Sequence, residues 1–282
     1  MSDAFKRWVA AAPIELQDFR RAVHVIVNVF ASSQQLHDAS FMKGGILMAI
    51  NYDSPRFTRD IDFSTPVAFD QTTAQIVCEG LANGLPSAIE SLGYDLDCRL
   101  QSSQLNPSPS ALHTWVNLHM RVGYVKKGTR GHERFPRGPW TNVVDIDYTF
   151  LESVPNAEAI EMGEGGTLCV YAITTLIAEK YRALLQQQSR NRVRRQDVFD
   201  IDLLLKHHGV FNETDRVQIL TTLQQKAVDR NIVVTHESFA APTLYERAKR
   251  EYPTLQDEVA GMLPDFDTIF ERVRTFYEGL PW

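Results

Sequence analysis

Two short segments of the sequence place an aspartate at every second position, with an apolar residue between. They are FTRDIDFST, residues 57–65, and VVDIDY, residues 143–148. Side chains two positions apart on a β-strand point to the same face and lie about 6–7 Å apart. The alternation therefore predicts two strands that each bury one face and present paired carboxylates on the other. The four aspartates are Asp60, Asp62, Asp145 and Asp147.

Paired carboxylates on one strand face repel each other unless a cation lies between them. Magnesium suits such a pair, because it binds carboxylate oxygens and keeps coordination positions open for phosphate. The alternative is a half-solvated strand whose wet face carries Asp60 and Asp62 without any ligand, which is the common case for an isolated Asp-x-Asp pair. The second acidic strand, from a distant part of the chain, favours a metal site.

A pair of glycines, Gly44 and Gly45, precedes the first acidic strand. A short helix from Ile46 and a turn that contains Pro55 are predicted between the glycines and Asp60. Glycine at a helix start lets backbone N–H groups approach a phosphate closely, although many turns use glycine without a ligand. A glycine turn together with three strand-borne carboxylates would form a two-metal phosphoryl-transfer site.

The remaining patterns divide the chain into an α+β half and a helical half. In the first half we expect helices at 14–38 and 70–92, and strands at 94–104 and 113–125. The two strands are separated by NPSPS. Residues 126–137 are rich in glycine, proline and cations, and predict an irregular basic loop. After a linker the expected helices are 169–188, 197–208, 212–230, 238–250 and 266–279. The predicted domains are 1–155, with a mixed sheet, and 156–282, a helical bundle.

The net charge is −6, from 29 Lys and Arg against 35 Asp and Glu, so the bulk charge does not indicate nucleic-acid binding. Two local basic segments, 126–137 and 190–195, are candidates for binding RNA phosphates. Three scattered cysteines match neither a disulfide framework nor a zinc site and indicate a reducing cytosol. We find no apolar run of about 18–20 residues and no secretory signal, so a cytoplasmic location and no membrane contact are expected.

One lysine, Lys180, lies within an apolar helical stripe in YAITTLIAEKYRALL, residues 171–185. Burying an unpaired ammonium is costly, so this amine either reaches solvent past its own helix or meets a phosphate or carboxylate. Asp197 follows the arginine-rich stretch SRNRVRR, residues 189–195. Asp197 is either the N-cap of the next helix or the partner of Lys180, and the arginines are either a solvated turn or phosphate contacts.

Four motifs in this order resemble those of the AbiEii-type nucleotidyltransferases, the toxins of type IV toxin–antitoxin and abortive-infection systems in the DNA polymerase β-like superfamily. They are KGGILMAINYDSPRFTRDIDF, VVDIDY, YAITTLIAEKYRAL and RRQDVFDIDLLL, within residues 40–205. The first motif is the most specific, because a double glycine and a gap of set length precede the residues that match the family pattern. These residues are Arg56, Thr58, Asp60 and Asp62. The resemblance implies a polymerase β-like α+β domain followed by a helical bundle.

The resemblance also implies an activity. A nucleotide would pass from a nucleoside triphosphate to a hydroxyl acceptor such as the 3′ end of a tRNA, with release of pyrophosphate. Such a modification would block translation and growth. A toxin of this kind implies a cognate antitoxin as its partner.

The same resemblance implies roles for individual residues. Magnesium, as two ions, is expected on Asp60, Asp62 and Asp145, with Asp147 as the alternative third carboxylate. The nucleotide is expected to contact Gly44, Gly45, Arg56, Thr58 and Lys180. Lys180 and Asp197 are expected to complete the catalytic site, with Asp200 as the alternative to Asp197. The further candidates are Lys43 and Arg195.

The chain departs from the family pattern at one position. Many members carry Ser or Thr at or just after the second glycine, whereas this chain has Ile46, so backbone N–H groups would bind the phosphate without a hydroxyl. Two rival interpretations are a catalytically silent nucleotide- or RNA-binding module of the same fold and, less favoured, an Asp-x-Asp glycosyltransferase. The glycosyltransferase needs a larger α/β region before the acidic pair than this chain has.

Overall fold

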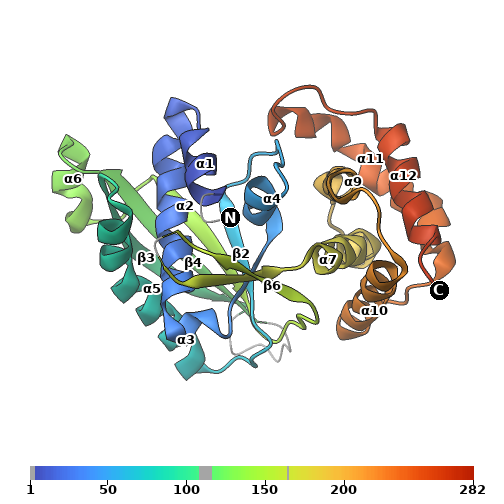
Figure 1. The fold of residues 1–282 in the computed structure, drawn as a ribbon, viewed down its shortest axis with the longest axis horizontal. Helices are drawn as coiled ribbons and strands as arrows, with labels where there is room; N and C mark the ends of the chain where they lie inside the picture. Colours follow the sequence, from blue (N-terminus) through green and yellow to red (C-terminus); the bar gives the residue numbers. More distant parts are fainter. Residues whose placement is uncertain (1–3, 108–115, 164) are drawn as a thin grey trace. The chain divides into compact units, whose positions relative to one another are not determined.

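The structure, a computed structural model, describes residues 4–107, 116–163 and 165–282, and the chain forms two compact units (Figure 1). The first unit contains the residues up to Asn51 and those from Arg59 to Val170. The second contains Tyr52–Thr58 and Tyr171–Trp282. The segment 52–58, which lies just before the first acidic strand in the sequence, is thus part of the second unit.

The first unit is built on a mixed sheet. Its strands, in spatial order, are β3 (Leu96–Asn106), β4 (Asn117–Lys126), β5 (Val143–Thr149), β2 (Asp60–Ser64), β1 (Phe41–Lys43), β7 (Thr167–Tyr171) and β6 (Ala157–Glu161). The acidic strands β2 and β5 are parallel neighbours, whereas β4 pairs with β5, and β1 with β2, in antiparallel fashion. Two strands that are far apart in sequence therefore lie side by side at the centre of the sheet.

Helices cover the apolar face of this sheet. They include α2 (Ile14–Ser32) and α5 (Gln71–Leu92), which pack against each other and against the strands (Figure 1). Ile61 and Phe63 of β2 are fully buried on that face, and Phe63 stacks on Phe30 of α2 with ring centroids 4.0 Å apart. The aspartates alternate with these residues and therefore point to the opposite face. The other helical segments of the unit are α1 (Ala4–Ala10), α3 (Gln34–His37), α4 (Gly44–Asn51), α6 (Arg130–Arg134) and the 3₁₀ turn η1 (Phe135–Arg137).

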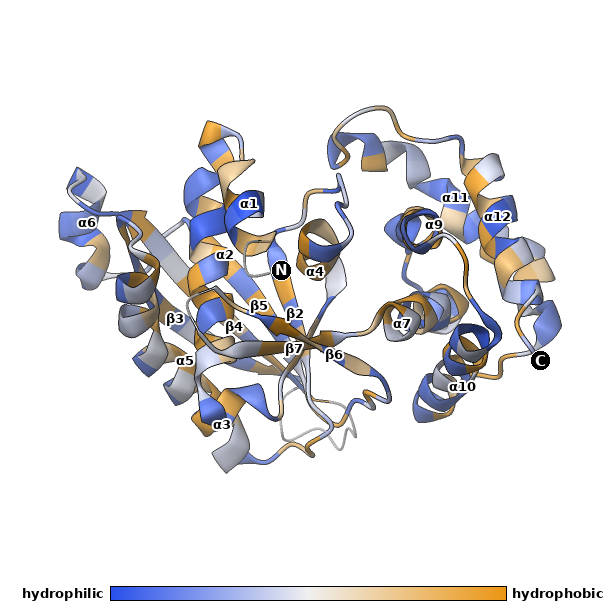
Figure 2. Cartoon of the chain, in the orientation of Figure 1, coloured by the Kyte–Doolittle hydropathy of each residue, from blue (hydrophilic) through white to orange (hydrophobic). Residues whose placement is uncertain are grey.

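The colouring by hydropathy agrees with this arrangement. In Figure 2 the hydrophobic colour is concentrated on the central strands, while α2 alternates between hydrophilic and hydrophobic bands along its length. A helix of this kind buries one stripe and leaves the rest to solvent. The ends of α5 follow local chemistry: the side chain of Asp70 accepts a hydrogen bond from Thr73 N, and Gly93 ends the helix at φ +65°.

The second unit is helical. Its elements are α7 (Ile173–Leu185), α8 (Gln187–Arg190), α9 (Arg195–His208), α10 (Glu213–Asp229), η2 (His236–Ala240), α11 (Pro242–Arg250), η3 (Tyr252–Asp257) and α12 (Phe266–Glu278). Tyr181, Phe239 and Tyr277 meet in its core. The segment 52–58 is hydrogen-bonded to this unit, because Phe57 N donates to Glu258 O at 2.7 Å and Ala260 N donates to Pro55 O at 3.0 Å.

The predicted fold class is confirmed: an α+β domain with a mixed sheet is followed by a helical region. The predicted boundary near residue 155 lies too early, because β6 and β7 belong to the sheet and the compact units divide after Val170. The residues of β7 were expected to begin a helix at 169. A five-residue apolar run does not distinguish a strand from a buried helix start, and β7 is held by a distant partner, Met42 of β1 opposite Val170.

The prediction of an irregular loop at 126–137 was wrong, since α6 and η1 lie within it. Thr129 caps α6 by accepting a hydrogen bond from His132 N, and contacts with β3 described below hold the segment in place. Most of the predicted break NPSPS, the first three residues of the predicted strand 113–125, and Glu164 in the linker lie outside the described residues. Within the part of the chain that the structure describes, no helix combines the length and apolar character needed to cross a bilayer.

Candidate active site

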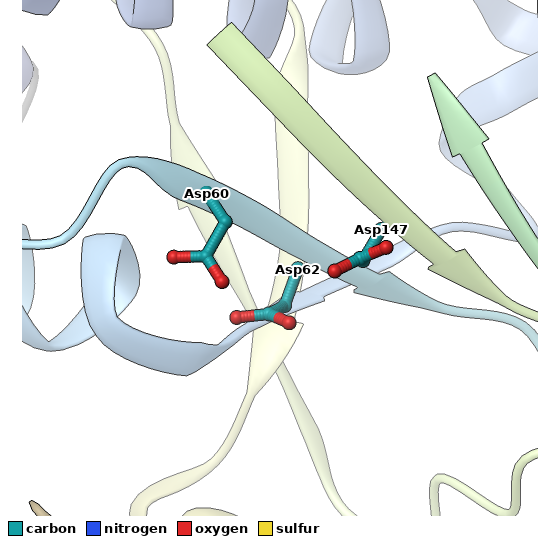
Figure 3. A group of neighbouring side chains, drawn as sticks. All are labelled: Asp60, Asp62 and Asp147. Atoms are coloured by element: carbon teal, nitrogen blue, oxygen red, sulfur yellow. The ribbon is translucent and has the colours of Figure 1, made fainter. Parts of the chain in front are cut away.

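Three carboxylates from two strands converge on the polar face of the sheet. Asp60, Asp62 and Asp147 each offer an oxygen, and these oxygens lie within 4.8 Å of one another (Figure 3). The parallel pairing of β2 and β5 produces this arrangement, because it sets Asp62 beside Asp147 in register. We call these three residues the carboxylate cluster. Oxygens at such distances match the ligand set of a magnesium ion, which commonly uses a few carboxylates and leaves positions open.

Asp145 is the neighbour of Asp60 in the same register, yet it is not in the cluster. Its Oδ1 lies 3.2 Å from Arg121 Nε and 3.3 Å from His119 Nε2, both on the adjacent strand β4. These contacts direct its carboxylate toward β4. The geometry thus brings Asp147 to Asp60 and Asp62, whereas the resemblance had placed Asp145 there first and Asp147 as the alternative.

His119 and Arg121 were not among the residues singled out from the sequence. His119 Nδ1 also lies 3.1 Å from Asp147 Oδ1, so this ring is next to both β5 carboxylates. A signal for both residues was present, because they alternate with buried Leu118 and Met120 in NLHMRV and so share the polar face of β4. Their contacts with the two β5 carboxylates depend on the pairing of β4 with β5. The alternation of polar and apolar residues along β4 does not reveal this pairing.

The choice between Asp145 and Asp147 leads to a prediction about metal binding. In Asp147→Asn we expect the affinity for Mn²⁺, a probe of the magnesium site, to fall by about ten- to a hundredfold, because a direct ligand loses its charge. In the matched variant Asp145→Asn we expect a change within about threefold, since Arg121 already pairs with that carboxylate. Calorimetric titration with Mn²⁺ measures both, and the reverse ranking would show that Asp145 is the ligand.

The first glycine of the pair lies directly against the cluster. Gly44 has φ +78°, and a Cβ built on it would lie 1.9 Å from Asp62 Oδ2. Only glycine both tolerates this left-handed conformation and leaves room for the carboxylate. Gly44 also begins α4, whose first backbone N–H groups have no partner within the helix. The glycine turn therefore sets a helix N-terminus beside Asp62.

Replacing this glycine tests the contact. Gly44→Ala and Gly93→Ala should both lose stability, by about 1–2 kcal/mol for a side chain in the left-handed region. A Cβ on Gly93 would meet no atom within 4 Å, so this variant reports the backbone strain alone. We expect Mn²⁺ affinity to fall by at least about tenfold in Gly44→Ala only, because Asp62 must move. Equal Mn²⁺ affinities in the two variants, by calorimetry, would refute a specific role for Gly44.

A second polar group borders the cluster. Lys43, which is opposite Asp62 in the β1–β2 register, donates a hydrogen bond to Glu152 Oε2 at 2.6 Å, and Ser64 Oγ donates to the same oxygen at 3.0 Å. Glu152 is 5 % exposed and was not expected from the sequence. Lys43, a lesser candidate, thus has a buried carboxylate partner. Ile46, where many family members have a hydroxyl, is buried in α4.

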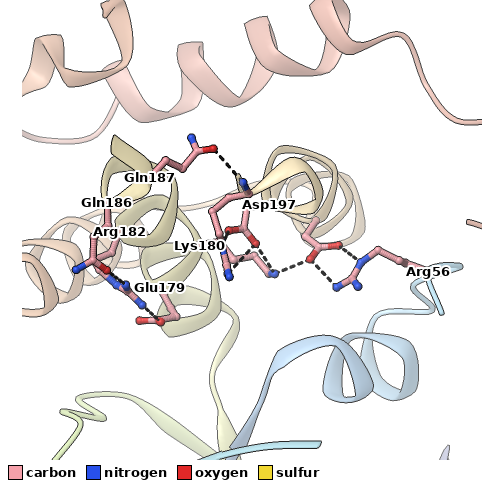
Figure 4. Close-up of polar contacts among 9 residues, drawn as sticks. Arg56, Glu179, Lys180, Arg182, Gln186, Gln187 and Asp197 are labelled. Carbon is pink, nitrogen blue, oxygen red and sulfur yellow. Dashed lines mark hydrogen bonds and ion pairs between the residues drawn. The ribbon is translucent and has the colours of Figure 1, made fainter. Parts of the chain in front are cut away.

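The candidates of the second unit form an ion network of their own (Figure 4). Lys180 Nζ donates to Asp200 Oδ2 at 2.6 Å and to Asp197 Oδ1 at 3.4 Å. Arg56 binds both oxygens of Asp200, at 3.1 and 2.9 Å, and Arg194 Nε lies 2.6 Å from Asp197 Oδ2. The two carboxylates are 0 % exposed. Lys180 is therefore buried against carboxylates and does not reach solvent, and Asp200 is its nearer partner.

The charges of this network affect the protonation of Asp200. Burial by itself acts to raise the pKa of its carboxyl, but the charges and hydrogen bonds of Lys180 and Arg56 outweigh burial and hold that pKa below its usual range. The guanidinium of Arg56 was expected to contact a nucleotide, and in the structure it forms an ion pair with Asp200. Arg195, another candidate, is bound to Glu258 and Thr254. Asp197 lies in the first turn of α9 and is not its N-cap, which is Arg194.

Comparison with known proteins agrees with the fold and the motifs. A family model described as nucleotidyl transferase AbiEii toxin, type IV TA system, matches residues 28–272. No match was found among curated proteins. A crystal structure from H. pylori, described as a proposed nucleotidyltransferase, has a TM-score of 0.52 and 14 % identity, and the match covers 95 % of both chains.

A second crystal structure, JHP933 from Helicobacter pylori, has a TM-score of 0.51 and 13 % identity, over 95 % of this chain and 92 % of that one. At such identities the two structures support the fold alone. The family model adds the ordered motifs over most of the length of the chain, and the resemblance seen in the sequence is confirmed. The chain belongs to the AbiEii nucleotidyltransferase toxin family of type IV toxin–antitoxin systems.

Proposed function

We propose that this member of the family is a magnesium-dependent enzyme that transfers a nucleotide from a nucleoside triphosphate to a hydroxyl acceptor and releases pyrophosphate. The observation that carries the proposal is the convergence of the carboxylate cluster on the glycine turn: three ligand oxygens lie within 4.8 Å, and Gly44 makes room for Asp62. A half-solvated strand pair has no need of a left-handed glycine under one of its carboxylates.

The donor set fits the metal. Asp60, Asp62 and Asp147 would hold magnesium, as one ion or as the expected two, because hard carboxylate oxygens are its preferred protein ligands. When bound, the metal would neutralise charge on the phosphates and on the attacking and leaving oxygens. The protein supplies the position of these ligands, since β2 and β5 are rigid central strands.

The chain's own contribution to phosphate binding is the start of α4. The N–H groups of its first turn, which have no partner within the helix, and the positive end of the helix favour an anion beside Asp62. Gly44 and Gly45 therefore stay our proposed nucleotide contacts, and a hydroxyl at Ile46 is not needed. The roles that the family implies for Lys180 and Asp197 also stay proposals, in addition to their ion pairs within the second unit.

We further propose that the acceptor is RNA, with the 3′ end of tRNA as the leading candidate, and that its modification stops translation and growth. A cognate antitoxin would be the natural partner of such a toxin. Support for these finer assignments comes from the family, whose description names a toxin of a type IV system. A silent binding module of the same fold is the alternative, and turnover distinguishes the two.

The test is label transfer. The protein is incubated with each of the four α-³²P-labelled nucleoside triphosphates and total RNA, with magnesium or with EDTA, and the products are separated by size. We expect label on RNA with magnesium only, together with release of pyrophosphate. Binding of nucleotide by calorimetry without any transfer to RNA would favour the silent module, and would refute the enzyme.

A further inference from the structure

The segment 126–137, which we call the basic arm, concentrates positive charge in an acidic protein. It has one acidic residue, Glu133, against five cations, whereas the whole chain carries a net charge of −6. The five cations are Lys126, Lys127, Arg130, Arg134 and Arg137. All five are exposed. None of their side chains has an ion pair or a hydrogen bond to another described residue.

The basic arm is an ordered segment that is held by contacts with strand β3. Arg99 of β3 donates hydrogen bonds to Pro136 O at 2.9 Å and Gly138 O at 2.6 Å, and its guanidinium lies 5.2 Å from the ring centroid of Phe135. Phe135 is buried, and Trp140 N donates to Gln101 Oε1 at 3.1 Å. These contacts hold the apolar and backbone atoms inward and leave the cations outward.

The arm docks on the same face of the sheet as the carboxylate cluster. Arg99 is the register partner of Gly123, which lies two residues from Arg121 on β4, and Arg121 is the partner of Asp145. Residues in register, and residues two apart, share a face. Lys126 is five residues beyond Arg121, which at about 3.3 Å per residue places the start of the arm roughly 17 Å along the strand.

The other basic segment, 190–195, differs from the arm because two of its arginines are already in ion pairs. Arg194 pairs with Asp197, and Arg195 is bound to Glu258 and Thr254. In this segment two cations, Arg190 and Arg192, remain available to bind a ligand, compared with five in the basic arm. The structure thus separates two basic segments: half of the cations of 190–195 are paired within their own unit, whereas none of the five cations of the arm is paired with a described residue.

We propose that the basic arm, and not segment 190–195, is the main contact of this protein with the phosphate backbone of its RNA acceptor. The proposal rests on the proposed function, since it takes the acceptor to be RNA. Exposed arginines and lysines on an ordered element bind phosphates without reading sequence. An acceptor whose end lies at the carboxylate cluster would place phosphates several nucleotides back at the arm, because the start of the arm lies roughly 17 Å along β4 from the row of Asp60 and Asp145.

Binding is tested with a fluorescein-labelled single-stranded RNA of about 20 nucleotides, in EDTA, by anisotropy over a series of salt concentrations. The two variants are matched: Arg130→Ala with Arg134→Ala in the arm, and Arg190→Ala with Arg192→Ala in the other segment. For the arm variant we expect about tenfold weaker binding at low salt and a salt slope smaller by about 1.4, from two lost phosphate contacts. The matched variant should bind within about twofold of wild type. Equal or greater loss in the matched variant would overturn the proposal.

Acceptor length provides the second readout. The arm variant should raise KM for long RNA acceptors by about tenfold and leave KM for a dinucleotide acceptor unchanged, because the dinucleotide cannot reach the arm. Equal effects on both acceptors would contradict the proposed placement. The EDTA binding experiment needs no turnover, so absence of label transfer in wild type would refute the proposed function while the arm is still judged by RNA binding.

Discussion

Asp60→Asn is expected to reduce nucleotidyl transfer by at least about a thousandfold, which corresponds to about 4 kcal/mol of transition-state stabilisation. Asp60 comes from the central strand β2 and contributes one of the three carboxylate oxygens that lie within 4.8 Å of one another in the carboxylate cluster. Asparagine keeps the shape of the side chain but removes the charge that a magnesium ion needs. The initial rate of label transfer to RNA measures the effect, and Asp18→Asn on the surface of α2 is the control that should retain activity.

The same variant separates a role in metal binding from a role in folding. Without metal, three neighbouring carboxylates repel one another, so Asp60→Asn should unfold in EDTA at the same temperature as wild type or a higher one. With magnesium at about 100 times its Kd, wild type should gain about 2.7 kcal/mol of stability and the variant much less. A variant that unfolds earlier in EDTA would indicate that Asp60 is structural, and full transfer activity would exclude it as a ligand.

The second large effect is expected in the ion network of the second unit. Asp200→Ala should destabilise the protein by about 3–5 kcal/mol, because it leaves Arg56 and Lys180 buried without their shared carboxylate. Asp200 is fully buried and binds both cations directly. Denaturant unfolding followed by far-ultraviolet circular dichroism, where the helical unit dominates, gives the free energy change. Asp267→Ala removes an exposed partner of Lys249 in the same unit and should have little effect.

A triple variant distinguishes the loss of charge pairing from a loss of packing. Replacing the network by apolar side chains, with Asp200→Leu, Lys180→Met and Arg56→Met together, should recover much of the stability, since no buried charge is then unpaired. If Asp200→Ala is no less stable than Asp267→Ala, the network does not stabilise the unit. If the triple variant is as unstable as Asp200→Ala, packing and not charge explains the loss.

The network also predicts how stability depends on pH. The pKa of Asp200 is lower in the folded protein than its ordinary value, near 3.8. The unfolded state then binds the proton more readily, so the contribution of Asp200 is fully present only above about pH 5, well above the unfolded pKa. It is lost as the pH falls through the depressed folded pKa. Wild type should therefore lose more stability than Asp200→Ala between about pH 5 and pH 2, and parallel curves would contradict the assignment.

Local chemistry was sufficient to predict several elements and their faces. The alternation of aspartates with Ile61 and Phe63 predicted β2, and the same pattern predicted β5. The predicted segment 70–92 corresponds to α5, which ends at Leu92 with Gly93 as its C-cap. The fold class, the helical second half and the family motifs also followed from the sequence. These features depend on the spacing of apolar and polar side chains along the chain and on the residues that cap helices. Both involve residues close together in sequence.

Other features required contacts that no local pattern contains. Both Asp145 and Asp147 lie on the polar face, and Arg121 on another strand decides which of them stays with Asp60. The sequence left open whether Lys180 reaches solvent or meets a carboxylate or phosphate, and its nearer partner, Asp200, was found only in the structure. Likewise the basic arm is ordered by Arg99, about thirty residues earlier in the chain.

The sequence by itself determined that this protein would carry acidic strand faces, a glycine turn before a helix, and a helical second half. It did so because side-chain period and helix ends are properties of neighbouring residues. Tertiary structure alone decided which carboxylates share a cation-sized space, why Gly44 must be glycine, and which basic segment keeps its charges free. The reason is physical: strand register, close approach and charge neutralisation depend on residues that only folding brings together.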